Sequence, residues 1–363
     1  MKKRKFDLVL FIAVILLILF GLIMIYSASS IWAEYKFHDS FKYVKQQSLF
    51  IIIGIVLMIT ISKLDYSWYY KKTNLILTVC LFLLVLVLIP GIGSVRNGSR
   101  SWFGIGSFGI QPSEFAKLGL IIFTAKYLSN NNKFLKDIRK GVIPILIVLF
   151  TVFGLIMLQP VFGTGMIIVV SILAMLFIAG VNIKFFIGLG VLGVGGIVFL
   201  ILIAPYRMDR ITSFIDPWKD PLGTGFQIIQ SLYAIGPGGL LGQGFLNSRQ
   251  KQFYLPEPQT DFIFSIISEE FGFLGVVIVS VLFITILYRG IKIALSCKDS
   301  FPKYLAFGMI FQILIQAVMN LMVVIGLIPV TGVTLPFLSY GGSSLLITLV
   351  SIGILLNISR YQK

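Results

Sequence analysis

Long apolar runs recur along the whole chain and constrain its fold more than any other feature. A helix needs about 20 apolar residues to cross ~30 Å of hydrocarbon, and fewer can suffice where its flanks are wet. Suitable runs lie near 8–29, 47–63, 74–91, 111–129, 142–159, 164–181, 185–205, 261–289, 304–328 and 341–358. The sequence therefore predicts an all-α membrane protein with ten transmembrane helices, forming a single polytopic domain over residues 1–363.

Composition excludes the alternatives to a membrane fold. Hydrophobic residues make up 57% of the chain and charged residues 12%, which no soluble core could absorb without large exposed apolar patches. Disordered chains are polar and poor in aromatic residues. The net charge of +16 would suggest nucleic acid in a soluble protein, but these basic residues mostly flank apolar runs. We therefore expect no nucleic-acid partner.

The distribution of Lys and Arg predicts the orientation in the membrane. With ten spans and a cytoplasmic N-terminus, the larger share of the 30 basic residues falls in cytoplasmic segments. Both termini are thus expected in the cytoplasm. The first apolar run follows the basic stretch 2–5 and exceeds the usual length of a signal-peptide core, so we interpret it as a retained first helix.

Two predicted exterior segments, 90–110 and 205–260, are too long to be simple connectors. Both are rich in aromatic residues and glycine, which favours ordered surface structure. The second is predicted to be a large extracellular loop between the seventh and eighth spans.

Cysteine and histidine content argues against several kinds of site. Cys80 lies in an apolar run and Cys297 in a short basic loop, so no disulfide is predicted. His38 is the single histidine, which makes a zinc site a poor hypothesis. No phosphate-binding Walker pattern or dinucleotide fingerprint occurs, and we expect no nucleotide cofactor.

Charged residues inside predicted spans are candidates for function because they are costly in a bilayer. Glu114 and Lys117 stand three residues apart and share one helical face. They could act on a substrate or merely form a neutralising pair between helices, and the residues favour neither interpretation. Glu269 and Glu270 are predicted about 12 Å further into the eighth span than Asp261, where at least one should meet a buried partner.

Asp261 is the sharpest single candidate. It follows a proline-containing approach, 255–260, and precedes the apolar run that opens the eighth span. A carboxylate at a water–hydrocarbon boundary is partly desolvated, which raises its pKa and its basicity. Aspartate is also a preferred helix N-cap, and the residues alone favour that simpler interpretation.

Several features predict an exterior site for an anion. The fourth span begins with Gln111 and Pro112, and its N-terminus, like those of the eighth and tenth spans, should face outward and attract phosphate. Guanidinium groups suited to phosphate occur in the exterior segments at Arg96, Arg100, Arg207 and Arg210. The alternative is that these arginines bind lipid headgroups.

Specific motifs resemble the SEDS family, the shape, elongation, division and sporulation proteins RodA, FtsW and SpoVE. The longest covers 331–344, Thr-Gly-Val-Thr-Leu-Pro-Phe-Leu-Ser-Tyr-Gly-Gly-Ser-Ser. Others cover 96–102, 111–114, 227–231 and 255–262. The resemblance extends over essentially the whole chain.

This resemblance implies a peptidoglycan glycosyltransferase that polymerises lipid II on the outer face of the bacterial cytoplasmic membrane, with a class B penicillin-binding protein as partner. The family's essential exterior aspartate matches Asp261, which is the expected catalytic base. A divalent cation, Mg²⁺ or Mn²⁺, could share the stabilisation of the pyrophosphate. Trp102 could contact a sugar or anchor its loop at the interface. The expected substrate-binding residues are Arg96, Arg100, Trp102, Gln111, Glu114, Lys117, Arg207, Arg210 and Ser343.

One departure from the family pattern keeps alternatives open. The family continues with Asp-Leu-Gly-Thr after Gln-Pro, whereas this chain has Val161 at the acidic position. Glu114 could replace the missing acid. A lipid II flippase and a non-catalytic scaffold for the transpeptidase are the alternative functions. The sequence does not distinguish among roles in cell division, cell shape and spore cortex synthesis.

Overall fold

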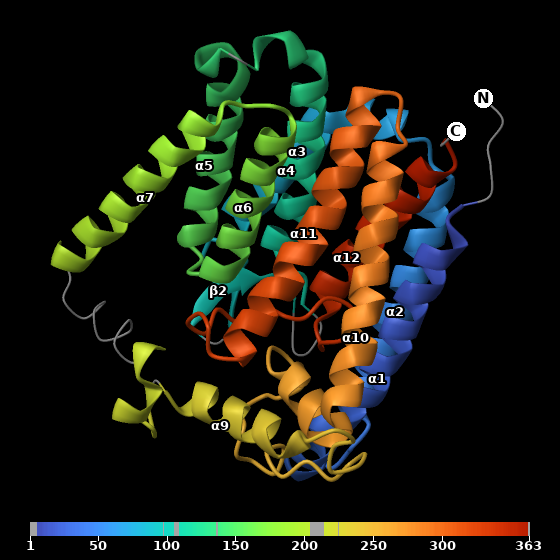
Figure 1. Ribbon diagram of the computed structural model, residues 1–363, viewed down its shortest axis with the longest axis vertical. Coiled ribbons are helices and arrows are strands. Elements are labelled where there is room, and N and C mark those ends of the chain that lie inside the picture. Colours follow the sequence, from blue (N-terminus) through green and yellow to red (C-terminus); the bar gives the residue numbers. More distant parts are fainter. Residues whose placement is uncertain are drawn as a thin grey trace.

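The computed structural model describes residues 6–96, 98–104, 109–135, 137–203, 214–223 and 225–361. In this part of the chain a helix covers each of the predicted apolar segments. All of these helices except α7, which leans away from the others, assemble into one bundle (Figure 1). They are α1 (Leu8–Phe37), α2 (Lys42–Lys63), α3 (Ser67–Leu86), α4 (Pro112–Asn130), α5 (Ile143–Met157), α6 (Phe162–Ile178), α7 (Ile183–Ile203), α10 (Ile263–Leu295), α11 (Ser300–Val324) and α12 (Gly342–Ser359).

Among the described residues, 7 helices are long and apolar enough to cross a membrane. They are α1, α2, α3, the segment Ile138–Met157, α10, α11 and α12, and shorter apolar helices occur at Phe162–Ile178 and Ile183–Gly193. The prediction of a multi-pass, helical membrane protein is confirmed. That all ten segments cross the bilayer stays a prediction.

The two long segments between spans contain folded elements. The first holds an antiparallel hairpin of β1 (Ser94–Arg96) and β2 (Ser99–Trp102). Segment 205–260 holds η3 (Pro217–Lys219), α9 (Phe226–Ile235) and η4 (Gly236–Gly238) in its described part. Short turns η1 (Asn132–Phe134) and η2 (Ile138–Val142) connect α4 to α5.

The two ends of the bundle differ in what they carry. At one end the amide of Asp7 donates to Ser359 Oγ over 3.0 Å, and Arg289 Nε donates to the Asp7 carboxylate over 2.9 Å. The first and last helices therefore meet there, and we call this the terminal end. The helix α9 and its loop cover the opposite end, here the α9 end (Figure 1). Because the chain enters α1 and leaves α12 at the same end, it crosses the bundle an even number of times.

Helix α10 is broken at Gly272, whose φ of 58° and ψ of −152° are not helical. The break divides α10 into a half-helix, 263–271, and a long arm, 273–295. Only glycine tolerates such backbone angles without strain. The expectation of one continuous eighth span is therefore wrong, whereas the expectation that at least one of Glu269 and Glu270 meets a buried partner is confirmed.

The loop 239–244 satisfies the peptide groups that the break exposes. The amides of Gln243 and Gly244 donate to the carbonyls of Glu269 and Glu270 over 2.9 and 3.0 Å. The amide of Phe273, at the start of the long arm, donates to the carbonyl of Gly239 over 2.9 Å. Unpaired backbone groups are costly beside hydrocarbon, so these bonds allow the break to exist at this place.

We expect Gly272→Ala to destabilise the chain. A Cβ at Gly272 would lie 2.6 Å from the carbonyl oxygen of Gly238 and 2.8 Å from that of Gly239, in a backbone region that L-residues avoid. The expected loss is roughly 2–4 kcal/mol in the free energy of unfolding, measured by denaturation in detergent. Gly154→Ala is the control because a Cβ there meets nothing within 4 Å. Equal stability of the two variants would contradict this account.

Candidate functional site

Asp261 lies just before the half-helix, and its carboxylate does not cap that helix. Phe262 occupies the N-cap position without a side-chain cap, so the N-cap prediction for Asp261 is wrong. Instead, Thr260 Oγ1 donates to Asp261 Oδ1 over 2.8 Å. The backbone carbonyl of Asp261 accepts a bond of 2.6 Å from Asn320 Nδ2 on α11. The backbone is thus fixed, and the residue as a whole remains partly exposed.

Glu257 accompanies Asp261 in the same loop. Burial raises the pKa of the Asp261 carboxyl, against the lowering effect of the Thr260 hydrogen bond. Desolvation, and then the negative charge of Asp261, raises the pKa of Glu257. The two carboxyl groups are therefore close enough to repel each other, and Asp261 has the raised basicity that the sequence predicted.

Arg96 brings a positive charge toward this loop. The amide of Tyr340 donates to the carbonyl of Gln259 over 2.8 Å, which places Tyr340 beside the Asp261 segment. The charge of Arg96 acts to lower the pKa of the Tyr340 hydroxyl, while burial, the larger effect, raises that pKa to about 12. The Arg96 guanidinium also lies over the Trp102 ring, 5.0 Å from its centroid. The Trp102 ring thus holds the Arg96 side chain in place.

Ser343, at the start of α12, bonds to the segment that leads into α4, so the N-termini of these two helices lie at the same end of the bundle. Its hydroxyl accepts from the amide of Gln111 over 3.1 Å and donates to the carbonyl of Gly109 over 3.0 Å. Pro112 occupies the first turn of α4 as predicted. Gly109 also packs against the Arg96 guanidinium. The structure therefore brings Arg96, Gln111 and Ser343 together at the α9 end.

Glu114 and Lys117 form a buried ion pair of 2.8 Å, with side chains 7% and 1% exposed. Lys117 Nζ also donates to Gln316 Oε1 on α11 over 2.8 Å. Gln316 Nε2 in turn donates to the carbonyl of Thr334 and to Ser344 Oγ. The pair joins α4, α11 and α12, which favours the structural interpretation of these two charges.

The remaining predicted arginines do not join this group. Arg100 Nη1 contacts the carbonyl of Leu88 at 3.5 Å and the Arg100 side chain packs against Gly93, so it braces the hairpin against the end of α3. Arg207 and Arg210 lie outside the described residues.

Sequence reasoning missed Asn320, Tyr340 and Glu257 as parts of this site. A signal for the first was present: Gln312, Gln316 and Asn320 recur every four residues along α11 and therefore share one face. All three are buried. Amide side chains on one buried face of a membrane helix mark a surface that meets polar partners.

Val161, at the position where the family pattern has an acidic residue, lies in an apolar environment. Val161 precedes the first turn of α6 and packs against the hydrophobic core. Within the described ranges, no group of three or more His, Cys, Asp or Glu side chains could hold a metal ion. A cation at this site would have to take ligands from the Asp261–Glu257 pair and from its substrate.

Comparison with known proteins identifies the family. Residues 7–363 match the sequence family of cell cycle proteins that comprises FtsW, RodA and SpoVE. The chain is 55% identical over 362 residues to stage V sporulation protein E of Bacillus subtilis, covering 100% of this chain and 99% of the relative. It is 42% identical to a probable peptidoglycan glycosyltransferase FtsW of Geobacter sp., again covering 100% and 99%. The chain belongs to the FtsW/RodA/SpoVE family.

Solved structures agree with this assignment. One is a chain of a peptidoglycan synthase complex studied for the coordination of polymerization and crosslinking, with a TM-score of 0.81, 33% identity and 99% of both chains covered. Another is the rod shape determining protein RodA of Thermus thermophilus, with a TM-score of 0.72, 28% identity, and coverage of 99% of this chain and 98% of that one. The predicted SEDS fold is therefore confirmed.

Proposed function

We propose that this chain is a peptidoglycan glycosyltransferase that polymerises lipid II, the undecaprenyl-pyrophosphate-linked disaccharide pentapeptide, into glycan strands. The observation that carries the proposal is the Asp261 carboxylate, held by its backbone at the α9 end with its pKa raised by burial. Membership of the family supports it, because curated relatives are named as probable peptidoglycan glycosyltransferases.

The geometry suits an inverting transfer between two lipid-linked sugars. Asp261 takes the proton from the acceptor sugar hydroxyl as that oxygen attacks the donor sugar. Undecaprenyl pyrophosphate departs with its electron pair. Arg96 and the amino-terminal ends of α4 and α12 face the charge that develops on the leaving group. The Trp102 ring stacks on the Arg96 guanidinium.

A divalent cation, Mg²⁺ or Mn²⁺, fits the donors present. Asp261 and Glu257 supply carboxylate oxygens, and Mg²⁺ is commonly bound by one or two carboxylates together with substrate phosphates and water. When bound, the cation would neutralise charge on the pyrophosphate. Burial, and then the negative charge of Asp261, raises the pKa of Glu257, and a cation bound to both carboxylates would relieve their repulsion.

The proposed setting is the bacterial cytoplasmic membrane, crossed ten times, with both termini in the cytoplasm and the α9 end outside. The even number of crossings and the excess of basic residues in the cytoplasmic segments support this orientation. On that outer face the chain would act with a class B penicillin-binding protein, in cell division, cell shape or spore cortex synthesis. The structural likeness to a chain of a peptidoglycan synthase complex supports such a partner.

No observation favours the flippase. A flippase predicts an inverted repeat and charged groups near the bilayer midplane. Glu269 and Glu270 instead bond to the loop at the α9 end, and Lys251 neutralises Glu270.

Asp261→Asn should abolish polymerisation without unfolding the chain. Loss of the general base should lower the rate by ~10²–10⁴-fold, measured with labelled lipid II and the cognate transpeptidase. When folding raises the pKa of a carboxyl group, the stability of the folded chain falls as the pH rises past the ordinary pKa of that group. The neutral Asn variant should therefore melt no lower than the native chain at pH 7.

The polymerisation rate of the native chain should fall as the pH decreases, because the base must be ionised. The midpoint of this fall should lie above pH 3.8, the ordinary pKa of aspartate. Asp39→Asn is the matched control, since Asp39 forms an exposed ion pair with Lys45. Full activity of Asp261→Asn would refute the mechanism.

Removal of divalent cations with EDTA should stop polymerisation, and Mg²⁺ or Mn²⁺ should restore it. Glu257→Gln should raise severalfold the cation concentration that gives half-maximal rate, because one of the two proposed carboxylate ligands is lost. Undiminished polymerisation in EDTA would show that the protein groups suffice alone.

A further inference from the structure

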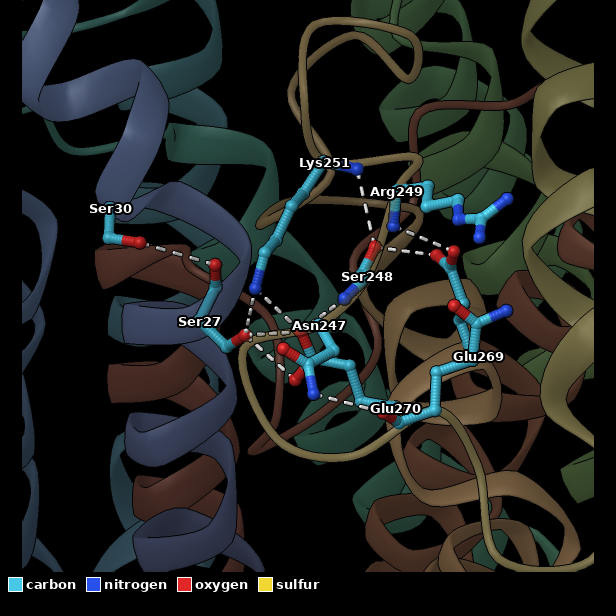
Figure 2. Close-up of polar contacts among 9 residues, drawn as sticks. Ser27, Ser30, Asn247, Ser248, Arg249, Lys251, Glu269 and Glu270 are labelled. Atoms are coloured by element: carbon cyan, nitrogen blue, oxygen red, sulfur yellow. Dashed lines mark hydrogen bonds and ion pairs between the residues drawn. The ribbon is translucent and has the colours of Figure 1, made fainter.

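A second polar cluster lies at the α9 end, apart from the group around Asp261. It joins α1, the loop after α9 and the last turn of the half-helix (Figure 2). Its members Ser27, Ser248, Lys251, Glu269 and Glu270 are each 4% exposed or less. Charged groups so deeply buried must satisfy one another, and their arrangement therefore has consequences for the segments that carry them.

Glu270 ties the half-helix to α1. Its two carboxylate oxygens accept from Ser27 Oγ at 2.6 and 2.7 Å. Lys251 Nζ forms an ion pair of 2.7 Å with the same carboxylate and donates to Ser27 Oγ over 3.0 Å. The Lys251 ammonium group, on the loop, thus contacts both the half-helix and α1.

Glu269 fixes the turn that presents Lys251. Its carboxylate accepts from Ser248 Oγ over 2.5 Å and from the amide of Arg249 over 2.8 Å. The amide of Lys251 donates to Ser248 Oγ over 3.3 Å. Although adjacent in sequence, the two glutamates therefore hold the same loop at different points.

The charge balance makes Lys251 decisive. The cluster contains two carboxylates and one buried ammonium group, and the Arg249 side chain is exposed. Removing one partner of a buried ion pair leaves an uncompensated charge, which favours entry of water and opening of the segment. Replacing both partners with neutral groups has a much smaller cost.

The half-helix connects this cluster to Asp261. Glu270 lies in its last turn, and Asp261 precedes the N-cap residue Phe262. Asn320 holds the Asp261 end, and Ser231 of α9 bonds to Ser265 in between over 2.7 Å. A short helix is stiff, so movement of its Glu270 end tilts the whole half-helix about the contact with Ser231 and shifts the Asp261 end.

We propose that Lys251 and Glu270 are positioning residues whose buried ion pair clamps the half-helix to α1 and thereby sets the place of the Asp261 carboxylate. The kinetic part of this inference rests on the proposed glycosyltransferase function. Arg96 and the starts of α4 and α12 are not part of the half-helix, so the clamp governs turnover and leaves substrate binding to other residues.

The test compares the full chain with Lys251→Met, Lys251→Met/Glu270→Gln and Arg249→Met, each in complex with the cognate transpeptidase. Arg249→Met is the matched control because it removes a positive charge from the same loop while retaining the backbone amide that binds Glu269. Hydrogen exchange of segment 263–271 reports the clamp directly. The kcat and KM for lipid II polymerisation report its effect on the reaction.

Lys251→Met should accelerate exchange in 263–271 and lower kcat by about 10–100-fold, with KM changed less than about twofold. The double variant should recover most of the protection and part of kcat, and Arg249→Met should match the native chain. If Lys251→Met fails to fold, Glu270→Gln alone, which keeps an acceptor for Ser27, should show the same split to a smaller degree.

Unchanged exchange, a loss confined to KM, or no recovery in the double variant would overturn the clamp. A native chain without polymerase activity, whose segment nevertheless loosens in Lys251→Met, would refute the proposed function and leave the mechanical role of the clamp supported.

Discussion

The hydrogen bonds between the loop 239–244 and the two sides of the break at Gly272 are the interaction on which the α9 end depends. Hydrocarbon offers no partner to an exposed peptide group, so a membrane helix breaks where other protein groups or water complete its bonding. Here the loop approaches closely because Gly238, Gly242 and Gly272 lack side chains. The break leaves a short half-helix that begins just after the Asp261 loop. Asp261 therefore lies on an irregular segment, while the long arm of α10 remains part of the bundle.

Two opposing requirements meet at Asp261. A base must be accessible to substrate, yet burial must raise its pKa for it to accept a proton near neutral pH. The structure separates these tasks: Asn320 and the half-helix fix the backbone, Thr260 orients the carboxylate, and the protein around it supplies the desolvation. Positive charge arrives from a different element, the hairpin that carries Arg96. The site is therefore assembled from three segments that are remote in sequence: the stretch 257–271, α11 and the hairpin.

The sequence predicted the helices well because apolar runs of membrane-spanning length reflect the bilayer itself, and it located Asp261 through the family motif. It failed at α10, where the run 261–289 gave no sign that Gly272 was more than a packing glycine. The partners of Gly272 lie in the loop 239–244, and only the fold brings them together. The N-cap interpretation of Asp261 also fails, because Phe262 occupies the N-cap position. Arg100 resembled a phosphate ligand but faces the end of α3.

Labelling of single cysteines in intact cells tests the central claim, that Asp261 is held on the outer side of the membrane. In a chain with Cys80 and Cys297 replaced by serine, Glu257→Cys reports the Asp261 loop and Lys298→Cys reports the terminal end; both native side chains are exposed. The account predicts that a membrane-impermeant maleimide labels position 257 in intact cells and position 298 only after permeabilisation. Labelling of 298 alone in intact cells would contradict it.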